Sequence, residues 1–396
     1  MRWASVLSDR SALDASIDDA AARLSEALGG EAPDLVLAFI AGHAAASERP
    51  HLRAISARFP GAALAGCTVG GAIGGGVELE QQAGVALMGG VLPGVEVRVT
   101  HLGPGELDPG RMEPGFWARH LGLSAAHQPS FLLLPDPLSC DTERVLGSMD
   151  AAFPGAPKVG GLASGARQGQ RNALLANSAV LEAGLVIVSL VGDVVMDTVV
   201  AQGCKALGPP LVVTAAERNL ILELDGRPAA DVLDGVFSTL SAPERALFQQ
   251  GPMIGIGIDP SKTVFQRGDF LVRNLIGLDR PRGLLGVAAA VRREQVVRFH
   301  ARDRDTSRDD LHELLGRYRR DHADALPVGA LMFSCVGRGR GLYGAANHDS
   351  RVFRQHLGGL PVAGFFCGGE IGPVHNRTFL HGYTNAIGLL RPAGWN

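Results

Sequence analysis

The segment Phe59-Pro-Gly-Ala-Ala-Leu-Ala-Gly-Cys-Thr-Val-Gly-Gly71 occurs three times along the chain in variant form. The second copy is Phe153-Pro-Gly-Ala-Pro-Lys-Val-Gly-Gly-Leu-Ala-Ser-Gly165, and the third is Leu357-Gly-Gly-Leu-Pro-Val-Ala-Gly-Phe-Phe-Cys-Gly-Gly369. In each copy an apolar stretch reaches a glycine (Gly66, Gly160 or Gly364), and a small residue and a glycine follow four and five positions later. Such internal similarity predicts one structural unit that is used three times.

The residues upstream of each copy extend this unit. Apolar stretches at 34–40, 130–134 and 329–334 predict a strand before each copy, and apolar residues at helical spacing predict a helix between. The helical spacing is weakest in the third copy, where only Phe353 and Leu357 lie four apart. Each unit is therefore predicted to be a strand, a helix and a parallel strand, because a parallel connection needs a crossover of about a dozen residues or more.

These units predict an α/β fold with mixed sheets, built from repeated strand-helix-strand units with glycine-rich turns. A further strand and helix are expected ahead of the first unit, from Trp3 and Ser11, and ahead of the third, from Val296 and Ser307. Two prolines in Leu207-Gly-Pro-Pro210 interrupt the pattern of secondary structure and indicate a domain boundary near this segment. We therefore expect two domains, 1–212 with two units and 213–396 with one.

Composition excludes several classes of protein. The 396 residues include 53 glycines, 46% are hydrophobic, 19% are charged, and the net charge is −3, so no basic field favours nucleic acid. The five cysteines are widely spaced without a CxxC pair, which indicates neither a disulfide framework nor a zinc site. The N-terminus lacks a signal peptide and no apolar run could span a bilayer. A soluble cytoplasmic protein without membrane contact is expected.

The third copy carries the chemistry. Cys335-Val-Gly-Arg-Gly339 follows its first strand, Gly368-Gly-Glu370 follows its second, and His381 and Tyr383 come next. Ends of parallel neighbouring strands meet at one sheet edge, where α/β proteins bind ligands. An arginine fork suits a carboxylate. Three alternatives stay open: a structural Arg338–Glu370 salt bridge, a nucleophilic Cys335 or Cys367 with His381 and Glu370, and a metal site of His375, His381 and Glu370, which fits no common ligand spacing.

Several motifs in order resemble the FIST family, whose paired FIST-N and FIST-C domains occur in bacterial signalling proteins and in an F-box protein. The resemblance rests on 64–73, 201–214, 222–229, 268–274, 335–339, 361–373 and 379–384. It implies a sensory module that binds a small ligand, with amino acids as the usual class, and implies no established reaction. No output domain is recognisable, so the protein could act through a separate signalling partner.

The first hypothesis is therefore a small-ligand sensor for an amino acid or similar carboxylate, without a cofactor or a metal. Arg338 and Arg273 would face an anionic group and Glu370 a cationic one. A cysteine-dependent hydrolase or transferase and a protein-interaction scaffold are the alternatives. The candidate ligand-binding residues are Arg273, Asn274, Cys335, Gly337, Arg338, Gly339, Gly368, Gly369, Glu370, His381 and Tyr383.

Overall fold

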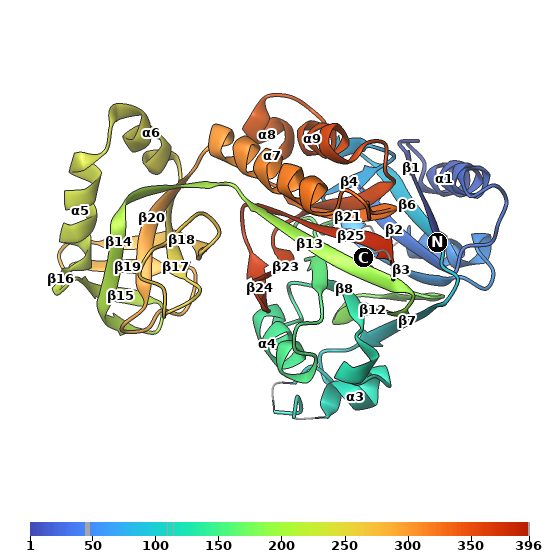
Figure 1. Ribbon diagram of the computed structural model, residues 1–396, viewed down its shortest axis with the longest axis horizontal. Coiled ribbons are helices and arrows are strands. Elements are labelled where there is room, and N and C mark those ends of the chain that lie inside the picture. Colours follow the sequence, from blue (N-terminus) through green and yellow to red (C-terminus); the bar gives the residue numbers. More distant parts are fainter. Residues whose placement is uncertain (44–47, 109, 114, 395–396) are drawn as a thin grey trace. The chain divides into compact units, whose positions relative to one another are not determined.

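The computed structural model describes residues 1–43, 48–108, 110–113 and 115–394 as a mixed α/β protein, which confirms the expected fold class (Figure 1). The chain forms two compact units. The first unit comprises Met1–Val200, Leu311–Leu380 and Thr384–Asn396, and the second comprises Ala201–Asp310 and His381–Tyr383.

The first unit consists of three repeats whose strands follow the same order, and the third has an extra short helix between its inner strands. The first repeat contains β1 (Arg2–Ser8), α1 (Leu13–Ala27), β2 (Leu35–Ala41), α2 (Arg49–Ala54), β3 (Ala63–Val69), β4 (Gly71–Gly74), β5 (Val77–Glu80) and β6 (Gly84–Val91). The second contains β7 (Val95–Leu102), α3 (Phe116–Leu121), β8 (Ser130–Pro135), α4 (Thr142–Ala152), β9 (Lys158–Gly161), β10 (Leu174–Ala176), β11 (Ala179–Leu181) and β12 (Leu185–Gly192). Single 3-10 turns lie at Ser56–Arg58 and Ala125–His127.

The third repeat is interrupted by the second unit. It begins with β13 (Val194–Gln202) and resumes with α7 (Arg304–Asp321). Its remaining elements are β21 (Gly329–Cys335), α8 (Gly339–Tyr343), α9 (His348–Leu357), β22 (Val362–Cys367), β23 (Glu370–Val374), β24 (Arg377–His381) and β25 (Thr384–Pro392). The strand at Val296–Arg302 was expected to lead this repeat, but it belongs to the sheet of the second unit and β13 leads instead.

The three repeats exchange hairpins. Their sheets have the orders β1-β6-β2-β3-β10-β11, β7-β12-β8-β9-β23-β24 and β13-β25-β21-β22-β4-β5. The hairpin β4–β5 of the first repeat thus completes the sheet of the third, β23–β24 of the third completes that of the second, and β10–β11 of the second completes that of the first. Each sheet is therefore incomplete without a neighbouring repeat.

The repeated glycine has one role in all three copies. Gly66, Gly160 and Gly364 each lie directly opposite a residue of the parallel partner strand. A Cβ atom at any of them would collide with the carbonyl oxygen of that partner. The partners are Ala38, Leu133 and Met332. The parallel strand-helix-strand unit is confirmed, and its glycine is required because two backbones approach closely.

The second unit is a closed antiparallel sheet with two helices. Its elements are β14 (Cys204–Glu217), β15 (Leu220–Leu224), β16 (Arg227–Pro228), α5 (Ala229–Thr239), α6 (Ala242–Gln250), β17 (Pro252–Gly257), β18 (Phe270–Asp279), β19 (Leu284–Val287) and β20 (Val296–Arg302). Strand β14 pairs with both β20 and β15, which closes the sheet. The domain boundary expected between residues 212 and 213 falls within β14, and the division into 1–212 and 213–396 stays a prediction.

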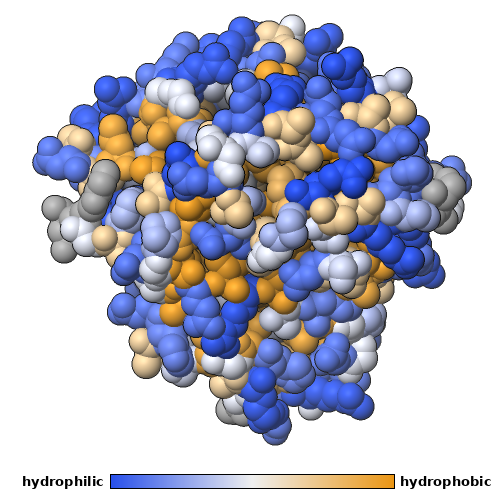
Figure 2. Space-filling view, turned by 90° about the vertical axis from the view of Figure 1, so that its right-hand side faces the viewer, coloured by the Kyte–Doolittle hydropathy of each residue, from blue (hydrophilic) through white to orange (hydrophobic). Residues whose placement is uncertain are grey.

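The core of the first unit joins the repeats. Phe39 of β2 lies 6.4 Å from Phe333 of β21 and 5.0 Å from Phe365 of β22, measured between ring centroids. Aromatic pairs at such distances stabilise a core by more than the burial of their surface area alone. Viewed from the side of β1 and α1, the surface shows hydrophobic residues gathered between hydrophilic ones (Figure 2). Among the described helices, none is both long and apolar enough to cross a membrane.

Candidate functional site

A buried group of polar residues lies where the central strands of the third repeat end. Residues Cys335 and Cys367 are register partners at the ends of β21 and β22. Ser334 is paired with Asn385 at the start of β25. The polar cluster is defined as Ser334, Cys335, Arg338, Asp349, Cys367, Glu370, Thr384 and Asn385, all of which are buried. The sheet edge predicted from the sequence therefore carries a dense set of polar groups.

Arg338 and Asp349 form the centre of the polar cluster. Nε of Arg338 donates to Oδ2 of Asp349 at 2.7 Å, and Nη2 donates to Oδ1 at 3.2 Å. The two side chains are 0% and 1% exposed. Burial by itself raises the pKa of Asp349, but the Arg338 guanidinium and the His348 imidazole outweigh it and hold the pKa below its usual value. The pair is therefore charged and fixed in a forked geometry.

Two atoms of the polar cluster have no hydrogen-bond partner among the described residues. Nδ2 of Asn385 donates to Asp349 at 2.9 Å, so the amide oxygen Oδ1 faces away from that carboxylate. This Oδ1 atom and Nη1 of Arg338 are both buried and unpartnered. A buried polar atom without a partner costs about 1–3 kcal/mol. A strong donor and an acceptor are thus left available within one buried cluster.

Glu370 adds a carboxyl group whose pKa lies close to physiological pH. Its Oε2 atom accepts hydrogen bonds from the Thr384 amide at 3.0 Å and the Thr384 hydroxyl at 2.8 Å. Burial raises the pKa of Glu370 to about 7, and the bonds from Thr384 only partly oppose this shift. Because a small change in surroundings moves such a group between its two states, Glu370 can respond to a nearby charge.

The cysteines do not have the surroundings of a nucleophile. Sγ of Cys367 lies 3.7 Å from Glu370 Oε1, and burial together with that carboxyl raises the pKa of the Cys367 thiol well above its usual value. All five cysteines are buried and none forms a disulfide. Nucleophilic cysteines are thiolates in electropositive, partly exposed sites. Burial and a raised thiol pKa therefore weigh against a nucleophilic Cys367.

The predicted site residues fall into two sets. Cys335, Gly337, Arg338, Gly339, Gly368, Gly369 and Glu370 lie together in the first unit, whereas Arg273, Asn274, His381 and Tyr383 belong to the second. In the second unit the Tyr383 hydroxyl donates to Oδ1 of Asn274 at 2.5 Å, and Arg302 lies 5.5 Å from the Tyr383 ring centroid. Arg273 donates to the carbonyl oxygen of Val272 at 3.3 Å. Ligand contact by either set stays a prediction.

The salt bridge between Arg338 and Glu370 that was one of the open alternatives is not the pair that forms. The partner of Arg338 is Asp349, in the first turn of α9. An acidic residue at that position usually indicates a favourable charge at a helix N-terminus, so it gives little sign of a buried ion pair. Sequence reasoning also missed Ser334 and Asn385, which lie inside otherwise apolar strands. Their polar side chains at buried strand positions were the available signal.

The first two repeats show what the fold needs at these positions. Aligned by the repeat and by strand register, they carry mainly apolar or glycine residues where the third repeat has polar ones. Ser334, Thr384, Asn385 and Glu370 correspond to Ile40, Gly84, Val85 and Ala72 in the first repeat and to Pro135, Gly184, Leu185 and Ala166 in the second. The fold therefore forms without polar side chains at these four positions, and those polar residues are specific to the third repeat.

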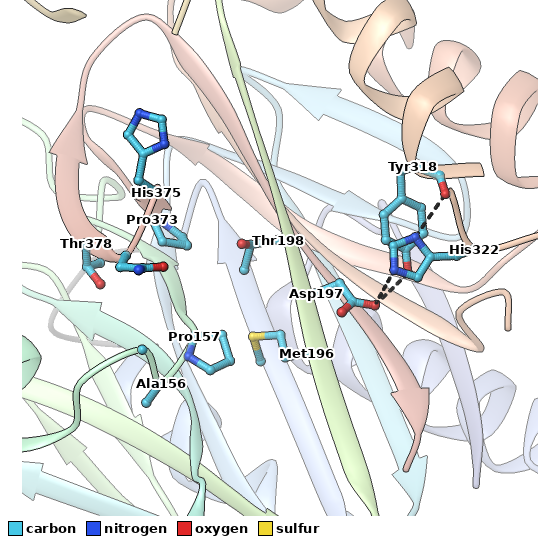
Figure 3. A pocket seen from close by; sticks show the side chains of 12 residues that line it. Ala156, Pro157, Met196, Asp197, Thr198, Tyr318, His322, Pro373, His375 and Thr378 are labelled. Carbon is cyan, nitrogen blue, oxygen red and sulfur yellow. Dashed lines mark hydrogen bonds and ion pairs between the residues drawn. The ribbon is translucent and has the colours of Figure 1, made fainter. Parts of the chain in front are cut away.

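A second polar feature lies in the cavity shown in Figure 3. This cavity of about 380 Å³ is bordered by β13, α7, the β23–β24 turn and residues 155–157. Oδ2 of Asp197 accepts from the Tyr318 hydroxyl and from Nε of Arg391, both at 2.8 Å, and His322 stacks on Tyr318. Burial and the bond to Asp197 raise the pKa of Tyr318. Because Arg391 neutralises Asp197, the described residues that line this cavity present no uncompensated carboxylate.

The fold and the polar cluster define an α/β protein of repeated units with one chemically specialised repeat. The FIST N domain matches residues 34–227 and the FIST C domain matches residues 229–373, so the chain belongs to the FIST family. It is 35% identical over 374 residues to an uncharacterized protein of Mycobacterium tuberculosis H37Rv, covering 94% of this chain and 95% of the relative. An uncharacterized protein of Mycobacterium bovis is 34% identical over 377 residues, 94% of each chain. FIST domains are associated with sensing in signal transduction.

Proposed function

We propose that this protein is a sensor that binds a small zwitterion, of the amino-acid class, at the polar cluster of the third repeat. The observation that carries the proposal is the pair of unpartnered buried atoms, Nη1 of Arg338 and Oδ1 of Asn385. Nη1 can donate to a carboxylate and Oδ1 can accept from an ammonium group. A ligand with both groups would satisfy both atoms.

The charge balance of the polar cluster favours a zwitterion over a simple anion. Asp349 already neutralises Arg338 in the forked pair. Glu370, with its pKa near 7, adds negative charge whenever it ionises. An anion would therefore meet no surplus positive charge, whereas the ammonium group of an amino acid would favour the ionised form of Glu370. Arg273, Asn274, His381 and Tyr383 stay predicted ligand residues of the second unit.

We also propose a cellular compartment and a type of partner for this sensor. Five cysteines without disulfides suit a reducing compartment, and we propose a cytoplasmic protein on that ground. The occupied sensor would act on a separate signalling protein. Neither a cofactor nor a metal is part of the proposed function.

The test is thermal unfolding in the presence of a panel of amino acids, small carboxylates and small amines. A ligand at about 100 times its dissociation constant adds about 2.7 kcal/mol to the free energy of unfolding. We expect amino acids to stabilise the protein more than the corresponding carboxylates or amines. The Arg338→Lys variant keeps a cation beside Asp349 but changes the donor geometry, and it should lose this stabilisation.

Arg340→Lys is the matched control, because Arg340 is an exposed arginine two positions away. It should respond to ligand as the unmodified protein does. A panel in which no amino acid shifts the transition would refute the ligand class. An amino-acid shift of the same size in Arg338→Lys would refute the role of the polar cluster.

A further inference from the structure

A second cavity of the first unit differs from the polar cluster in charge and in walls. It measures about 520 Å³ and lies between β1, the end of α1, the β4–β5 turn, α9 and residues 358–362. Its walls are largely apolar or glycine, and the apolar residues include Phe353, Leu360 and Val362. Pockets of this size with few polar groups are typical binding sites for small molecules.

Among the described residues that line this cavity, Arg354 is the one that carries a charge. Nη2 of Arg354 donates to the carbonyl oxygen of Gly76 at 3.2 Å. Arg354 is solvent-exposed, and within the part of the chain that the structure describes its guanidinium has no acidic partner. A cavity whose single charge is an unpaired guanidinium favours an anionic ligand.

The turn between β4 and β5 permits this position of the guanidinium. Gly75 and Gly76 form the turn with φ angles of +56° and +77°. A Cβ atom at Gly76 would collide with Nη2 of Arg354. The corresponding turns of the other two repeats carry Asn177 and His375 at the first position. The two glycines therefore let the arginine lie directly against the turn.

Trp3 also contributes to the wall of this cavity. Trp3 lines the cavity and is 5% exposed, and its Nε1 atom is buried without a partner among the described residues. The indole N–H can only donate a hydrogen bond. The unsatisfied donor capacity of Arg354 matches an acceptor-rich group such as a carboxylate or a phosphate.

The cavity around Asp197 provides an internal comparison. It lies at the corresponding place of the third repeat, between the leading strand, the end of the first helix, the hairpin turn and the segment before the next inner strand. There Asp197 and Arg391 neutralise each other. A cavity therefore forms at both junctions between repeats. The arginine is neutralised in the cavity around Asp197 and has no acidic partner among the described residues in the cavity lined by Trp3.

We propose that the cavity between β1 and α9 binds a small organic anion, whose carboxylate or phosphate group contacts Arg354 and whose short apolar body lies against Phe353, Leu360 and Val362. The apolar walls select against a bare inorganic ion, and the glycine turn holds the guanidinium at the cavity. This second site is independent of the polar cluster, because it involves none of its residues. Hydrophobic side chains also reach the surface on the side of β1 and α1 (Figure 2).

The experiment uses hexanoate, hexyl phosphate, hexylamine and inorganic phosphate as probes with the full chain. Tryptophan fluorescence reports binding, and a Trp3→Phe variant identifies the signal that comes from Trp3. We expect hexanoate, hexyl phosphate or both to change the emission, and hexylamine and inorganic phosphate to bind at least about tenfold more weakly. Which of the two anions binds more tightly identifies the head group.

Three variants test the residues. Arg354→Gln should weaken binding of the anion by about tenfold or more, since charge-assisted hydrogen bonds contribute that much to affinity. Arg351→Gln, on the same helix but outside the cavity, should bind as the unmodified protein does. Gly76→Ala should also weaken binding, because it displaces the guanidinium. Unchanged anion binding in Arg354→Gln, equal binding of hexylamine, or no response to either anion would overturn the proposal.

Discussion

Replacing Arg338 by methionine tests the centre of the polar cluster most directly. The change leaves Asp349 buried, with 1% of its side chain exposed, and removes both arms of the fork at 2.7 and 3.2 Å. Breaking a buried ion pair by removing one partner costs about 3–5 kcal/mol. Asp349 keeps donors on Ser334, His348 and Asn385, so we expect the lower end, about 3 kcal/mol.

The loss should depend on pH, and the sign follows from Asp349. In the unmodified protein Arg338 holds the pKa of Asp349 low, so this stabilisation is present above the unfolded value of 3.8 and is lost only in strong acid. In Arg338→Met burial is no longer outweighed by the arginine, and the pKa of Asp349 rises above that value. Protonation then relieves the strain as the pH falls, so the variant should be less destabilised at pH 5 than at pH 8.

Urea unfolding followed by tryptophan fluorescence measures the effect in the first unit alone. Trp3 and Trp117, the tryptophans among the described residues, both lie in the first unit. The double variant Arg338→Met/Asp349→Leu is the control, because replacing a whole buried pair by apolar residues is often neutral or stabilising. A single variant that loses less than about 1 kcal/mol, or a double variant less stable than the single one, would refute this account.

Three further changes test other parts of the structure. Gly364→Ala should destabilise the first unit by about 1–3 kcal/mol or more in urea unfolding, because its Cβ would collide with the partner strand. The control, Gly341→Ala in α8, places its Cβ in open space and should be neutral or stabilising. Equal effects of the two variants would contradict the role given to Gly364. The free energy of unfolding of the unmodified protein should fall as the pH rises from about 4.5 to about 7, because the folded state keeps the proton on Glu370. Glu370→Gln should reduce this dependence of the unfolding free energy on pH. An unchanged dependence would contradict the raised pKa of Glu370. Cys367 should react with an alkylating reagent more slowly than a free model thiol, as followed by mass spectrometry, and rapid labelling would revive the cysteine-dependent alternative.

The sequence was sufficient to predict the repeated unit, because its main constraint is local. Two parallel strands approach closely at the same place in each copy, and only glycine fits there. Gly66, Gly160 and Gly364 therefore recur at that position. The exchange of hairpins was beyond sequence reasoning. A short strand such as β4 carries no signal for which of three similar sheets it will join, and an insertion separates β13 from the rest of its repeat.

The same distinction holds for the site. Arg338 and Glu370 were predicted because polar residues between glycines at strand ends are conspicuous, and Asp349 was missed because its pairing with Arg338 is a tertiary contact. A carboxylate in the first turn of a helix is ordinarily explained by the helix dipole. Asn385 was missed because it lies in a strand whose neighbours are apolar, where burial is evident only from the sheet.

Hairpin exchange also links the first repeat to the polar cluster. Glu78 of β5 accepts a hydrogen bond from the Ser350 amide at 2.6 Å, and its own amide donates to Asn347 at 2.7 Å. These bonds hold the N-terminus of α9, the helix that carries Asp349. Burial and the neighbouring Asp349 raise the pKa of Glu78 to about 7. Glu78 therefore couples the charge of the polar cluster to the hairpin that joins the two repeats, and the proposed ligand would act on the first repeat through this contact.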